Sequence, residues 1–320
     1  MSSKISFQNN SRWGEKNSWV WRTYKCHWRV LGKNNKKPLL FLHGFGASSA
    51  HWRNNAYFFA QNGFKVFSLD LIGFGKSDQP GPNRLKKLDN FVWSMQVADF
   101  LREVIKTTDN GKVTIIGNSL GGLVGITTAA FNHELVDSVI AAPLADPDLI
   151  KRQNRKPPRW LFSAKNKLIT IFFKLLPLEL IIPLIAKTNL IILALQSAYN
   201  HSIKLDSDLK RIVIEPSQRD TAPRALRAMC IGMSTREAKL TAPYLLDRIR
   251  SIPDHAKILL IWGKKDKFIP LALSKRLTNR FPWLQLSIIN NAGHCPHDES
   301  PSDFNQCVLN WLKNNSERYI

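Results

Sequence analysis

Short apolar runs alternate with segments of helical periodicity in the first half of the chain. The run at 38–42 is apolar throughout, the run at 113–116 is β-favouring, and the runs at 64–69 and 136–142 are mostly apolar; all follow an aromatic and β-branched stretch at 19–30. Runs of this length, bounded by glycine-rich loops, predict strands buried on both faces. The segments 54–61 and 90–107 place apolar residues at helical spacing and predict helices. This alternation predicts an α/β fold with a mostly parallel sheet.

The alternation of strands and helices is interrupted in the middle of the chain. Residues 144–250 contain no buried strand followed by a glycine-rich loop, and they predict several helices separated by prolines. Alternation resumes with apolar runs at 258–262 and 284–289, a helix between them and a final helix. We therefore expect four parts: a frayed N-terminus at 1–18, a core at 19–143, an inserted helical lid at 144–250, and the rest of the core at 251–320.

Residues 113–122 place a serine between a strand and a helix. The β-favouring run leads into Gly117-Asn118-Ser119-Leu120-Gly121, and a helix-forming run follows. This order predicts a nucleophile elbow, in which a sharp turn projects the serine hydroxyl into a site. Gly117 and Gly121 let the backbone cross over itself where a Cβ would clash. The helix that begins at Ser119 directs free N–H groups toward an oxyanion.

Two loops that follow predicted strands supply the partners that a serine nucleophile needs. Asp266 comes just after the run at 258–262, and His294 comes after the run at 284–289. The carboxyl ends of parallel strands gather at one edge of the sheet, so we expect Ser119, Asp266 and His294 to meet there. His294 would accept the serine proton and return it to the leaving group, while Asp266 fixes the imidazole tautomer. The chain order Ser, Asp, His fits this interpretation.

The loop after the first buried strand of the core is expected to stabilise the reaction intermediate. We predict that the backbone N–H groups of Phe45 and Leu120 form an oxyanion hole. His43 is expected to support this loop rather than to transfer protons. The residues expected to support the site or contact the substrate are His43, Gly44, Gly46, Asn118, Trp160 and Phe172.

Other titratable residues near these loops are alternatives to the triad. His297 is the second candidate for the base, although His294 lies closer to the strand end in the sequence. Asp146, which follows the run at 136–142, is the second candidate for the acid. Cys295, next to the candidate base, is expected to be a packing residue.

The cysteines and the N-terminus bear on cofactors and location. Cys26, Cys230, Cys295 and Cys307 have no paired spacing that suggests a metal site or a disulfide framework, which fits a reducing compartment. The serine chemistry expected here needs no cofactor or metal. The N-terminus lacks the apolar stretch of a signal peptide, and no run of about 18 apolar residues is present. We therefore expect a cytoplasmic protein without a transmembrane helix.

The formal net charge of +22 has two interpretations. The chain shows no pattern of a DNA- or RNA-binding module, so no nucleic-acid partner is expected. Between Leu149 and Leu178, eight basic residues and no acidic residue are interleaved with large apolar side chains. Either the lid packs this apolar stripe on the core and leaves the cations in water, or it rests on an anionic membrane surface. The second interpretation makes the protein peripheral to an internal membrane.

Several stretches resemble the α/β-hydrolase superfamily, and they lie in both halves of the predicted core. They are His43-Gly44-Phe45-Gly46, Asp70-Leu71-Ile72-Gly73-Phe74-Gly75-Lys76-Ser77, Gly117-Asn118-Ser119-Leu120-Gly121-Gly122 and Trp262-Gly263 with Asp266. The resemblance implies an α/β-hydrolase fold. The stretches 46–53 and 292–299 are similar to those of the pheophytinase and chlorophyll dephytylase relatives of plants and cyanobacteria, which cleave the phytyl ester of chlorophyll-type pigments. This narrower resemblance implies Ser119, Asp266 and His294 as the triad.

We therefore expect a serine hydrolase that cleaves a bulky lipophilic carboxylic ester through an acyl-Ser119 intermediate. The serine argues against haloalkane dehalogenases and epoxide hydrolases, which carry an aspartate at this position. Other enzymes on the same fold stay open as alternatives: a general lipase or esterase, a C–C bond hydrolase, and a haloperoxidase-like protein. A receptor-type binder of small molecules is the non-enzymatic alternative.

Overall fold

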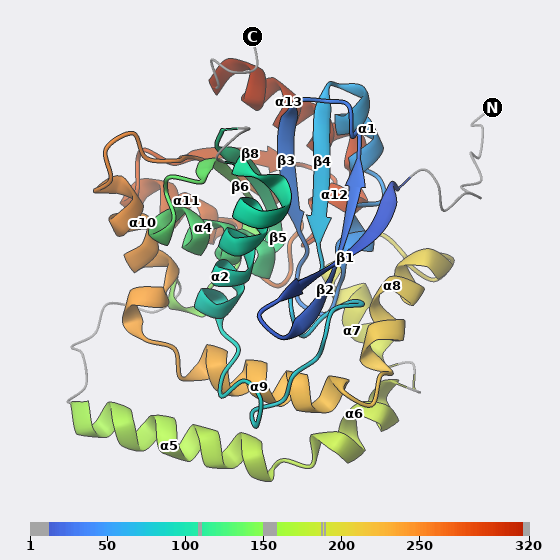
Figure 1. Ribbon diagram of the computed structural model, residues 1–320, viewed down its shortest axis with the longest axis vertical. Helices are drawn as coiled ribbons and strands as arrows, with labels where there is room; N and C mark the ends of the chain where they lie inside the picture. Colours follow the sequence, from blue (N-terminus) through green and yellow to red (C-terminus); the bar gives the residue numbers. More distant parts are fainter. Residues whose placement is uncertain (1–12, 108–110, 150–158, 187, 189, 316–320) are drawn as a thin grey trace.

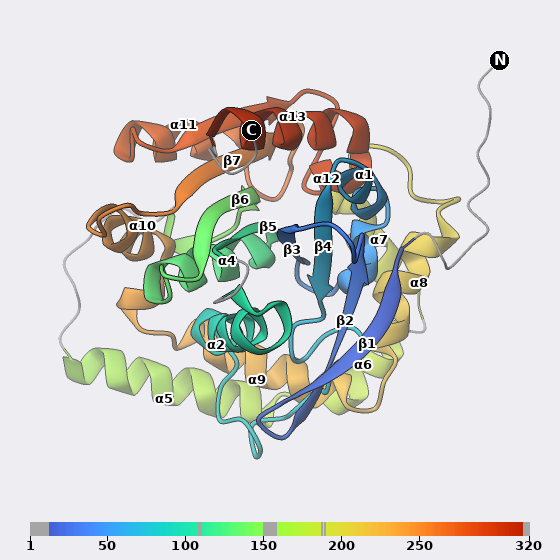
Figure 2. The same ribbon diagram turned by 45° about the horizontal axis from the view of Figure 1, so that its top comes forward.

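An eight-stranded sheet forms the centre of the computed structural model, which describes residues 13–107, 111–149, 159–186, 188 and 190–315. The strand order is β1-β2-β4-β3-β5-β6-β7-β8 (Figures 1 and 2). The β1–β2 and β2–β4 pairs are antiparallel, and all other pairs are parallel. The predicted α/β fold with a mostly parallel sheet is therefore confirmed. The strands are β1 (Glu15–Trp21), β2 (Tyr24–Leu31), β3 (Lys37–Leu42), β4 (Phe64–Leu69), β5 (Val113–Ser119), β6 (Val136–Leu144), β7 (Lys257–Gly263) and β8 (Gln285–Ile289).

The central strands are buried on both faces because helices cover both sides of the sheet. In β3, Leu40 packs into one hydrophobic cluster and Phe41 into the other, as the alternation of side chains along a strand requires. The first face is covered by α2 (Asn90–Phe100), α4 (Leu120–Phe131), α10 (Ala242–Arg250) and α11 (Leu271–Arg280). The second face is covered by η1 (Ser49–Trp52), α1 (Ala56–Gln61) and α13 (Pro301–Asn315).

The described residues of the β6–β7 segment, residues 145–256, form helices joined by turns and loops, with no strand among them. It contains η3 (Pro147–Leu149), α5 (Arg159–Leu175), α6 (Leu178–Ala186), α7 (Leu190–Ala198), α8 (Ser207–Ser217), α9 (Ala222–Ser234), η4 (Ala238–Leu240) and α10. In Figure 1, α5, α6 and α9 run across one end of the sheet. Arg227 of α9 donates hydrogen bonds to the carbonyl oxygens of Phe173 and Leu176 and pairs with Glu179, which holds α5 and α6 against α9.

The structure corrects several boundaries of the predicted elements. Residues 15–18 are not frayed, because β1 begins at Glu15 and pairs with β2 from Glu15 opposite Val30. The helix expected at 90–107 comprises α2 and a turn of π-helix, η2 (Leu101–Ile105), which ends where Lys106 adopts φ 59°. α10 belongs to the main hydrophobic cluster and packs against α4, although it lies in the stretch of sequence assigned to the lid.

Candidate active site

Ser119 stands at an abrupt junction between β5 and α4. β5 ends at Ser119 and α4 begins at Leu120, with no residue between them. The backbone of Ser119 has φ 51° and ψ −111°, a conformation that residues with a Cβ rarely adopt. Two glycines allow this turn: a Cβ on Gly117 would lie 2.2 Å from the carbonyl carbon of Gly121, and one on Gly121 would lie 2.3 Å from the carbonyl oxygen of Leu42.

His294 and Asp266 form a buried hydrogen-bonded pair. The Nδ1 atom of His294 lies 3.0 Å from Oδ2 of Asp266. The other carboxylate oxygen accepts the backbone N–H groups of Phe268 at 2.8 Å and Ile269 at 2.9 Å, so the carboxylate cannot rotate freely. Because a carboxylate can only accept, Nδ1 carries the hydrogen, and Nε2 is left with the lone pair that a general base needs.

The loop that carries His294 is fixed by residues from two distant parts of the chain. The backbone N–H of His294 donates to the carbonyl oxygen of Ala198 at 2.9 Å, at the end of α7. Glu299 accepts the N–H groups of Gly293 at 2.8 Å and of Asn200 at 2.6 Å. Asn118, beside the serine, donates from Nδ2 to the carbonyl oxygens of His294 at 3.2 Å and of Ala142 at 2.7 Å. The β6–β7 segment thus helps to fix the backbone of the loop that carries His294.

The loop that follows β3 is supported from below by His43. The Nε2 atom of His43 accepts the backbone N–H of Leu71 at 3.0 Å, so Nδ1 carries the hydrogen that it shares with the carbonyl oxygen of Gly44 at 2.8 Å. Burial lowers the pKa of His43, which keeps the ring neutral. A Cβ on Gly44 would lie 2.5 Å from Oδ1 of Asn118, and Gly46 adopts φ 72°. The loop that carries Phe45 therefore closely approaches the turn at Ser119, and the oxyanion hole expected from Phe45 and Leu120 stays a prediction.

Ser119 and His294 line one cavity of about 560 Å³. Its other walls come from the loops after β3 and β4, from α6 and α7, and from α8 and α9. Among them are Phe45, Phe74, Ile182, Ile185, Ile191, Leu195, Val213, Leu226 and Met229. No Lys, Arg, Asp or Glu is found among the described residues of these walls. A volume of this size suits a small organic ligand, and the walls favour an apolar one.

The two sequence alternatives to the triad, Asp146 and His297, occupy other positions, and Cys295 lies beside the candidate base. Asp146 does not contact His294 as an acid would; its carboxylate pairs with buried Arg236 and accepts the backbone N–H of Ala242 at 2.7 Å. His297 packs its buried ring against Trp52, with ring centroids 4.3 Å apart, and burial lowers its pKa far below the ordinary value. Cys295 does line the cavity, but burial raises the pKa of its thiol well above the ordinary value, which disfavours a reactive thiolate.

The two aromatic residues of the predicted lid have different outcomes. Phe172 is not a wall of the cavity: its side chain is 59% exposed on α5. The reason is that α6 and α7, rather than α5, present side chains to the cavity. The side chain of Trp160 lies outside the part of the chain that the structure describes.

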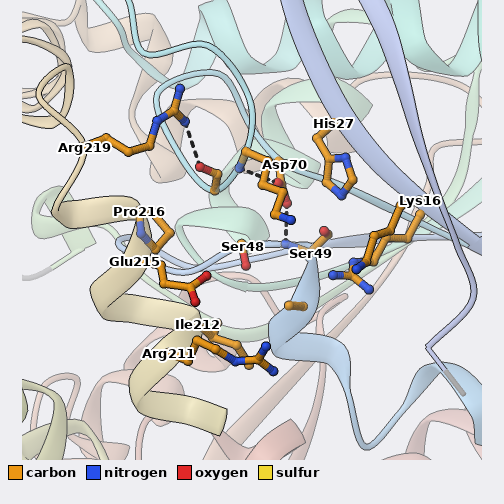
Figure 3. Close-up of a pocket in the computed structure, with 14 residues that line it drawn as sticks. Lys16, His27, Ser48, Ser49, Asp70, Arg211, Ile212, Glu215, Pro216 and Arg219 are labelled. Carbon is orange, nitrogen blue, oxygen red and sulfur yellow. Dashed lines mark hydrogen bonds between the residues drawn. The ribbon is translucent and has the colours of Figure 1, made fainter. Parts of the chain in front are cut away.

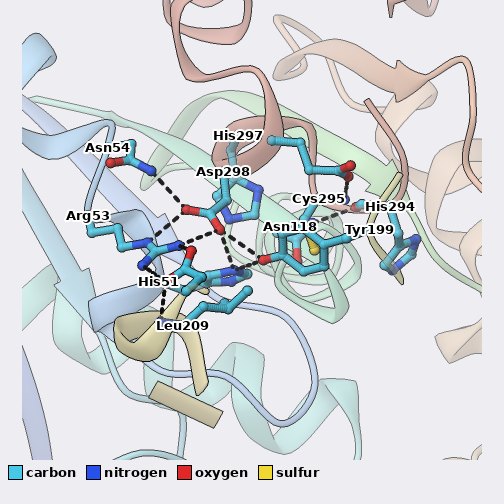
Figure 4. Close-up of polar contacts among 12 residues, drawn as sticks. His51, Arg53, Asn54, Asn118, Tyr199, Leu209, His294, Cys295, His297 and Asp298 are labelled. Carbon is cyan, nitrogen blue, oxygen red and sulfur yellow. Dashed lines mark hydrogen bonds and ion pairs between the residues drawn. The ribbon is translucent and has the colours of Figure 1, made fainter. Parts of the chain in front are cut away.

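A polar network beside the cavity was missed by sequence reasoning. The hydroxyl of Tyr199 lies 2.9 Å from Oδ2 of Asp298 and 2.8 Å from Nε2 of His51, which lines the cavity (Figure 4). Arg53 binds Asp298 through two 3.0 Å hydrogen bonds and also binds Asp206. His51, Arg53 and Asp298 stand in the stretches 46–53 and 292–299 that resemble a known family, but neither periodicity nor spacing gives them a role.

The neutral form of His51 follows from its burial. Although Nε2 lies 3.7 Å from the carboxylate of Asp298, burial lowers the pKa of His51 to about 4. The tyrosine hydroxyl has one proton, which goes to the carboxylate because a carboxylate can only accept. His51 therefore donates from Nε2 to the tyrosine oxygen. No group of three or more His, Cys, Asp or Glu placed to hold a metal occurs among the described residues.

Comparison with known proteins finds relatives that align with most of this chain. The chloroplastic pheophytinase of Arabidopsis thaliana is 26% identical, and the alignment covers 90% of this chain but only 64% of that protein, so the chain spans less than two thirds of this relative. The 2-hydroxy-6-oxononadienedioate/2-hydroxy-6-oxononatrienedioate hydrolase of Escherichia coli is 25% identical, with 91% of this chain and 92% of the relative covered. The solved structure of a thermophilic esterase from Thermogutta terrifontis has a TM-score of 0.66 at 16% identity, covering 95% and 100% of the two chains.

The family assignment rests on a match to most of the chain. The family model described as the alpha/beta hydrolase family matches residues 39–306. These residues run from β3 to α13 and include Ser119, Asp266 and His294. The chain therefore belongs to the alpha/beta hydrolase family.

Proposed function

We propose that this protein is a serine hydrolase that cleaves a bulky, lipophilic carboxylic ester. One observation carries the proposal: Ser119 and His294 line the same mostly apolar cavity, and the hydrogen bond to Asp266 orients the imidazole. A serine hydroxyl becomes an effective nucleophile only beside a base, and the base needs a third group to orient it.

The proposed reaction has two steps. Ser119 attacks the ester carbonyl while Nε2 of His294 takes its proton, and the backbone N–H groups of Phe45 and Leu120 stabilise the oxyanion. The alcohol leaves with the proton from His294, which yields an acyl-Ser119 intermediate. Water, activated by the same imidazole, then releases the acid and restores the serine. Asp266 keeps the imidazole in the required tautomer throughout.

The cavity supports an uncharged substrate with a long or bulky apolar group. A carboxylate on the substrate would have to leave water for walls on which the described residues carry no cationic side chain, and an unpaired buried charge is costly. We therefore place C–C bond hydrolysis of a dicarboxylate, the reaction class suggested by the name of the Escherichia coli relative, second. The phytyl ester of a chlorophyll-type pigment is the specific substrate we propose, supported by the similarity to pheophytinase.

We further propose that the outer face of α5 and α6 rests on an anionic membrane. Leu175 is 77% exposed and Leu180 is 74% exposed, and Lys165, Lys167 and Lys174 are exposed on the same helix as Leu175. Lysines beside exposed apolar side chains are typical of a helix that binds an anionic surface. No single described helix is long and apolar enough to span a membrane; the pair 163–175 and 178–185, bent by 61°, meets the criteria of length and composition together.

Labelling with a fluorophosphonate probe tests the nucleophile. We expect the wild type to be labelled and Ser119→Ala not to be. Ser251→Ala is the matched control, because Ser251 caps α10 on the surface, and it should label like the wild type. An unlabelled wild-type protein contradicts the hydrolase proposal and favours the receptor-type binder.

Substrate and membrane contact need separate measurements. Purified protein is incubated with p-nitrophenyl esters of increasing chain length and with chlorophyll-type pigments; we expect release of phytol, absent in Ser119→Ala. Turnover of p-nitrophenyl esters without release of phytol would reject the pigment as the substrate but would support ester hydrolysis. Flotation with vesicles of phosphatidylglycerol tests the proposed membrane contact. We expect salt-sensitive binding that Leu175→Asp weakens. Absence of binding at low salt would reject the membrane contact.

A further inference from the structure

A second cavity, of about 340 Å³, lies between the edge of the sheet and α8 (Figure 3). β1 and β2 supply one wall and α8 supplies the opposite wall, while the loops after β3 and β4 close the base. Its cationic side chains are Lys16, Arg29, Lys76, Arg211 and Arg219. The carboxylates among its described walls are Asp70 and Glu215. The chemistry proposed for Ser119 leaves this cavity without a role.

Arg29 is a charged side chain buried in this cavity. Its exposed fraction is only 8%, and its Nε atom has no hydrogen-bond partner among the described residues. The guanidinium packs against the ring of Trp13, 5.6 Å from the ring centroid. A buried cation is costly unless it is paired and hydrogen-bonded, so the missing partner calls for an explanation.

The other cations of the cavity repel one another. The pKa of Lys16 is lowered, first by the charge of Arg29, then by burial, and then by Lys76 and Arg211. Arg211 also pairs with Asp208 at 2.9 Å, but both side chains are more than half exposed, so water screens this pair. An anion placed among these side chains would relieve the repulsion.

The two carboxylates leave this charge imbalance in place. Asp70 is buried, and its oxygens already accept the backbone N–H groups of Ser49 at 2.6 Å and Lys76 at 2.8 Å. Burial lowers the pKa of Arg29, and the charge of Asp70 offsets that shift only in part. Glu215 is on the exposed side of α8, where Figure 3 shows its carboxylate directed toward the cavity between Ser48 and Arg211. Glu215 therefore competes with any anion that enters.

We propose that this cavity binds a phosphate group, carried either by an anionic lipid headgroup or by a small soluble phosphate compound. A guanidinium offers a planar fork of donors that matches a phosphate, and lysines add charge without a fixed geometry. A set of cations on two opposite walls suits a group with up to two charges and several acceptor oxygens better than a single carboxylate. The proposal is independent of the activity of Ser119.

Titration with inorganic phosphate tests the site directly. Full-length protein is titrated by calorimetry at low and constant ionic strength, with sodium chloride as the control for screening. We expect saturable binding. The imidazole of His27, which lines the cavity, provides a second readout: its pKa is lowered by burial and by Arg29, Lys76 and Lys16, and a bound anion should raise it in an NMR titration.

Variants distinguish this cavity from the general positive charge of the protein. Lys16→Ala and Arg211→Ala should each raise the Kd for phosphate about tenfold, a typical loss for one charge-assisted hydrogen bond. Lys275→Ala removes an exposed charge from α11 and should leave the Kd unchanged. Glu215→Gln should tighten binding several-fold, a gain that no loss of folding can mimic. Arg29→Met should abolish phosphate binding. If Arg29→Met does not fold, Lys16→Ala, Arg211→Ala and Glu215→Gln still test the site.

A final comparison separates the two sources of phosphate. Vesicles of phosphatidic acid in phosphatidylcholine are compared with soluble glycerol phosphate, using wild type and Arg211→Ala. A lipid headgroup is indicated if only the vesicles bind and Arg211→Ala weakens them; a soluble ligand is indicated if glycerol phosphate binds and competes with inorganic phosphate. Absence of saturable phosphate binding, or equal losses in Lys275→Ala and Arg211→Ala, would overturn the proposal.

Discussion

The hydroxyl of Tyr199 donates a 2.9 Å hydrogen bond to the buried carboxylate of Asp298. Tyr199 follows α7, and Asp298 lies in α12 (Pro296–Glu299), four residues after His294. Arg53 of the core binds the same carboxylate at 3.0 Å through Nε. The buried charge of Asp298 therefore links the core to the β6–β7 segment. The position of the candidate base therefore depends on how this segment packs.

Replacing Tyr199 should lower the stability of the protein because its buried hydrogen bonds are lost. In Tyr199→Phe, Asp298 and His51 each lose a buried hydrogen-bond partner, which should cost about 1–3 kcal/mol of unfolding free energy. Urea denaturation followed by circular dichroism measures the change. Tyr57→Phe serves as the control, because Tyr57 is exposed on α1. An equal loss in both variants would contradict a special role for the buried network.

The two candidate acids should respond differently to the same change. Asp266→Asn should lower kcat of ester hydrolysis on the order of 10³- to 10⁴-fold, because the amide favours the wrong imidazole tautomer. The folded state should be kept. Asp146→Asn should instead leave buried Arg236 without its charged partner and lower stability by about 3 kcal/mol. Steady-state kinetics and urea denaturation of both variants check this; a reversed pattern would make Asp146 the acid.

Acid should destabilise the protein partly through His51. Burial lowers the pKa of His51 to about 4 in the folded state, from an ordinary value of 6.5. Between these pH values the unfolded chain binds more protons, so stability is complete above pH 6.5 and falls as the pH drops toward 4. The loss from this residue approaches about 3 kcal/mol.

Urea denaturation at a series of pH values from 7 to 4 measures this dependence. Buried His43 and His297 shift in the same direction, so the wild type should show a steep decline. His51→Gln, which keeps a donor for Tyr199, should show a shallower one. Parallel curves for wild type and variant would mean that His51 is not buried in its neutral form.

Two glycine variants should separate steric clash from backbone strain. In Gly121→Ala, the new Cβ would lie 2.3 Å from a backbone oxygen of Leu42, so we expect a loss above about 3 kcal/mol or failure to fold. In Gly63→Ala, no atom lies within 4 Å, and only the left-handed φ of 85° opposes the change, which should cost about 1–2 kcal/mol. Melting temperatures of both variants measure these losses. If Gly121→Ala lowered the melting temperature no more than Gly63→Ala does, the close approach of Gly121 to Leu42 would be contradicted.

The sequence predicts best where local pattern and physical cause coincide. The run at 113–116 contains only β-favouring residues, and all four are buried because β5 is covered on both faces. The strand ends place Ser119, Asp266 and His294 on one edge. Their catalytic roles stay predictions. Helical periodicity shows that α10 and α5 have apolar faces, but it does not say what covers them. For this reason, the sequence places α10 in the lid, although α10 packs on α4. It also predicts that Phe172 contacts the substrate, although the side chain of Phe172 is exposed.

Long-range contacts of single polar residues lie beyond such reasoning. Tyr199 and Asp298 are 99 positions apart, and no periodicity links them. Arg29 reads as one cation in a basic chain, and only the three-dimensional structure shows that Arg211, from a helix of the β6–β7 segment, faces it across a cavity.

Pro216 of α8 is a wall of both cavities, the apolar one beside Ser119 and the cationic one beside Arg29. A shift of α8 therefore changes the shape of both at once. If occupation of one cavity selects a position of α8, the affinity of the other changes by the same factor in both directions, since coupling between two binding sites is reciprocal. Through Pro216, binding in one cavity can thus be coupled to binding in the other.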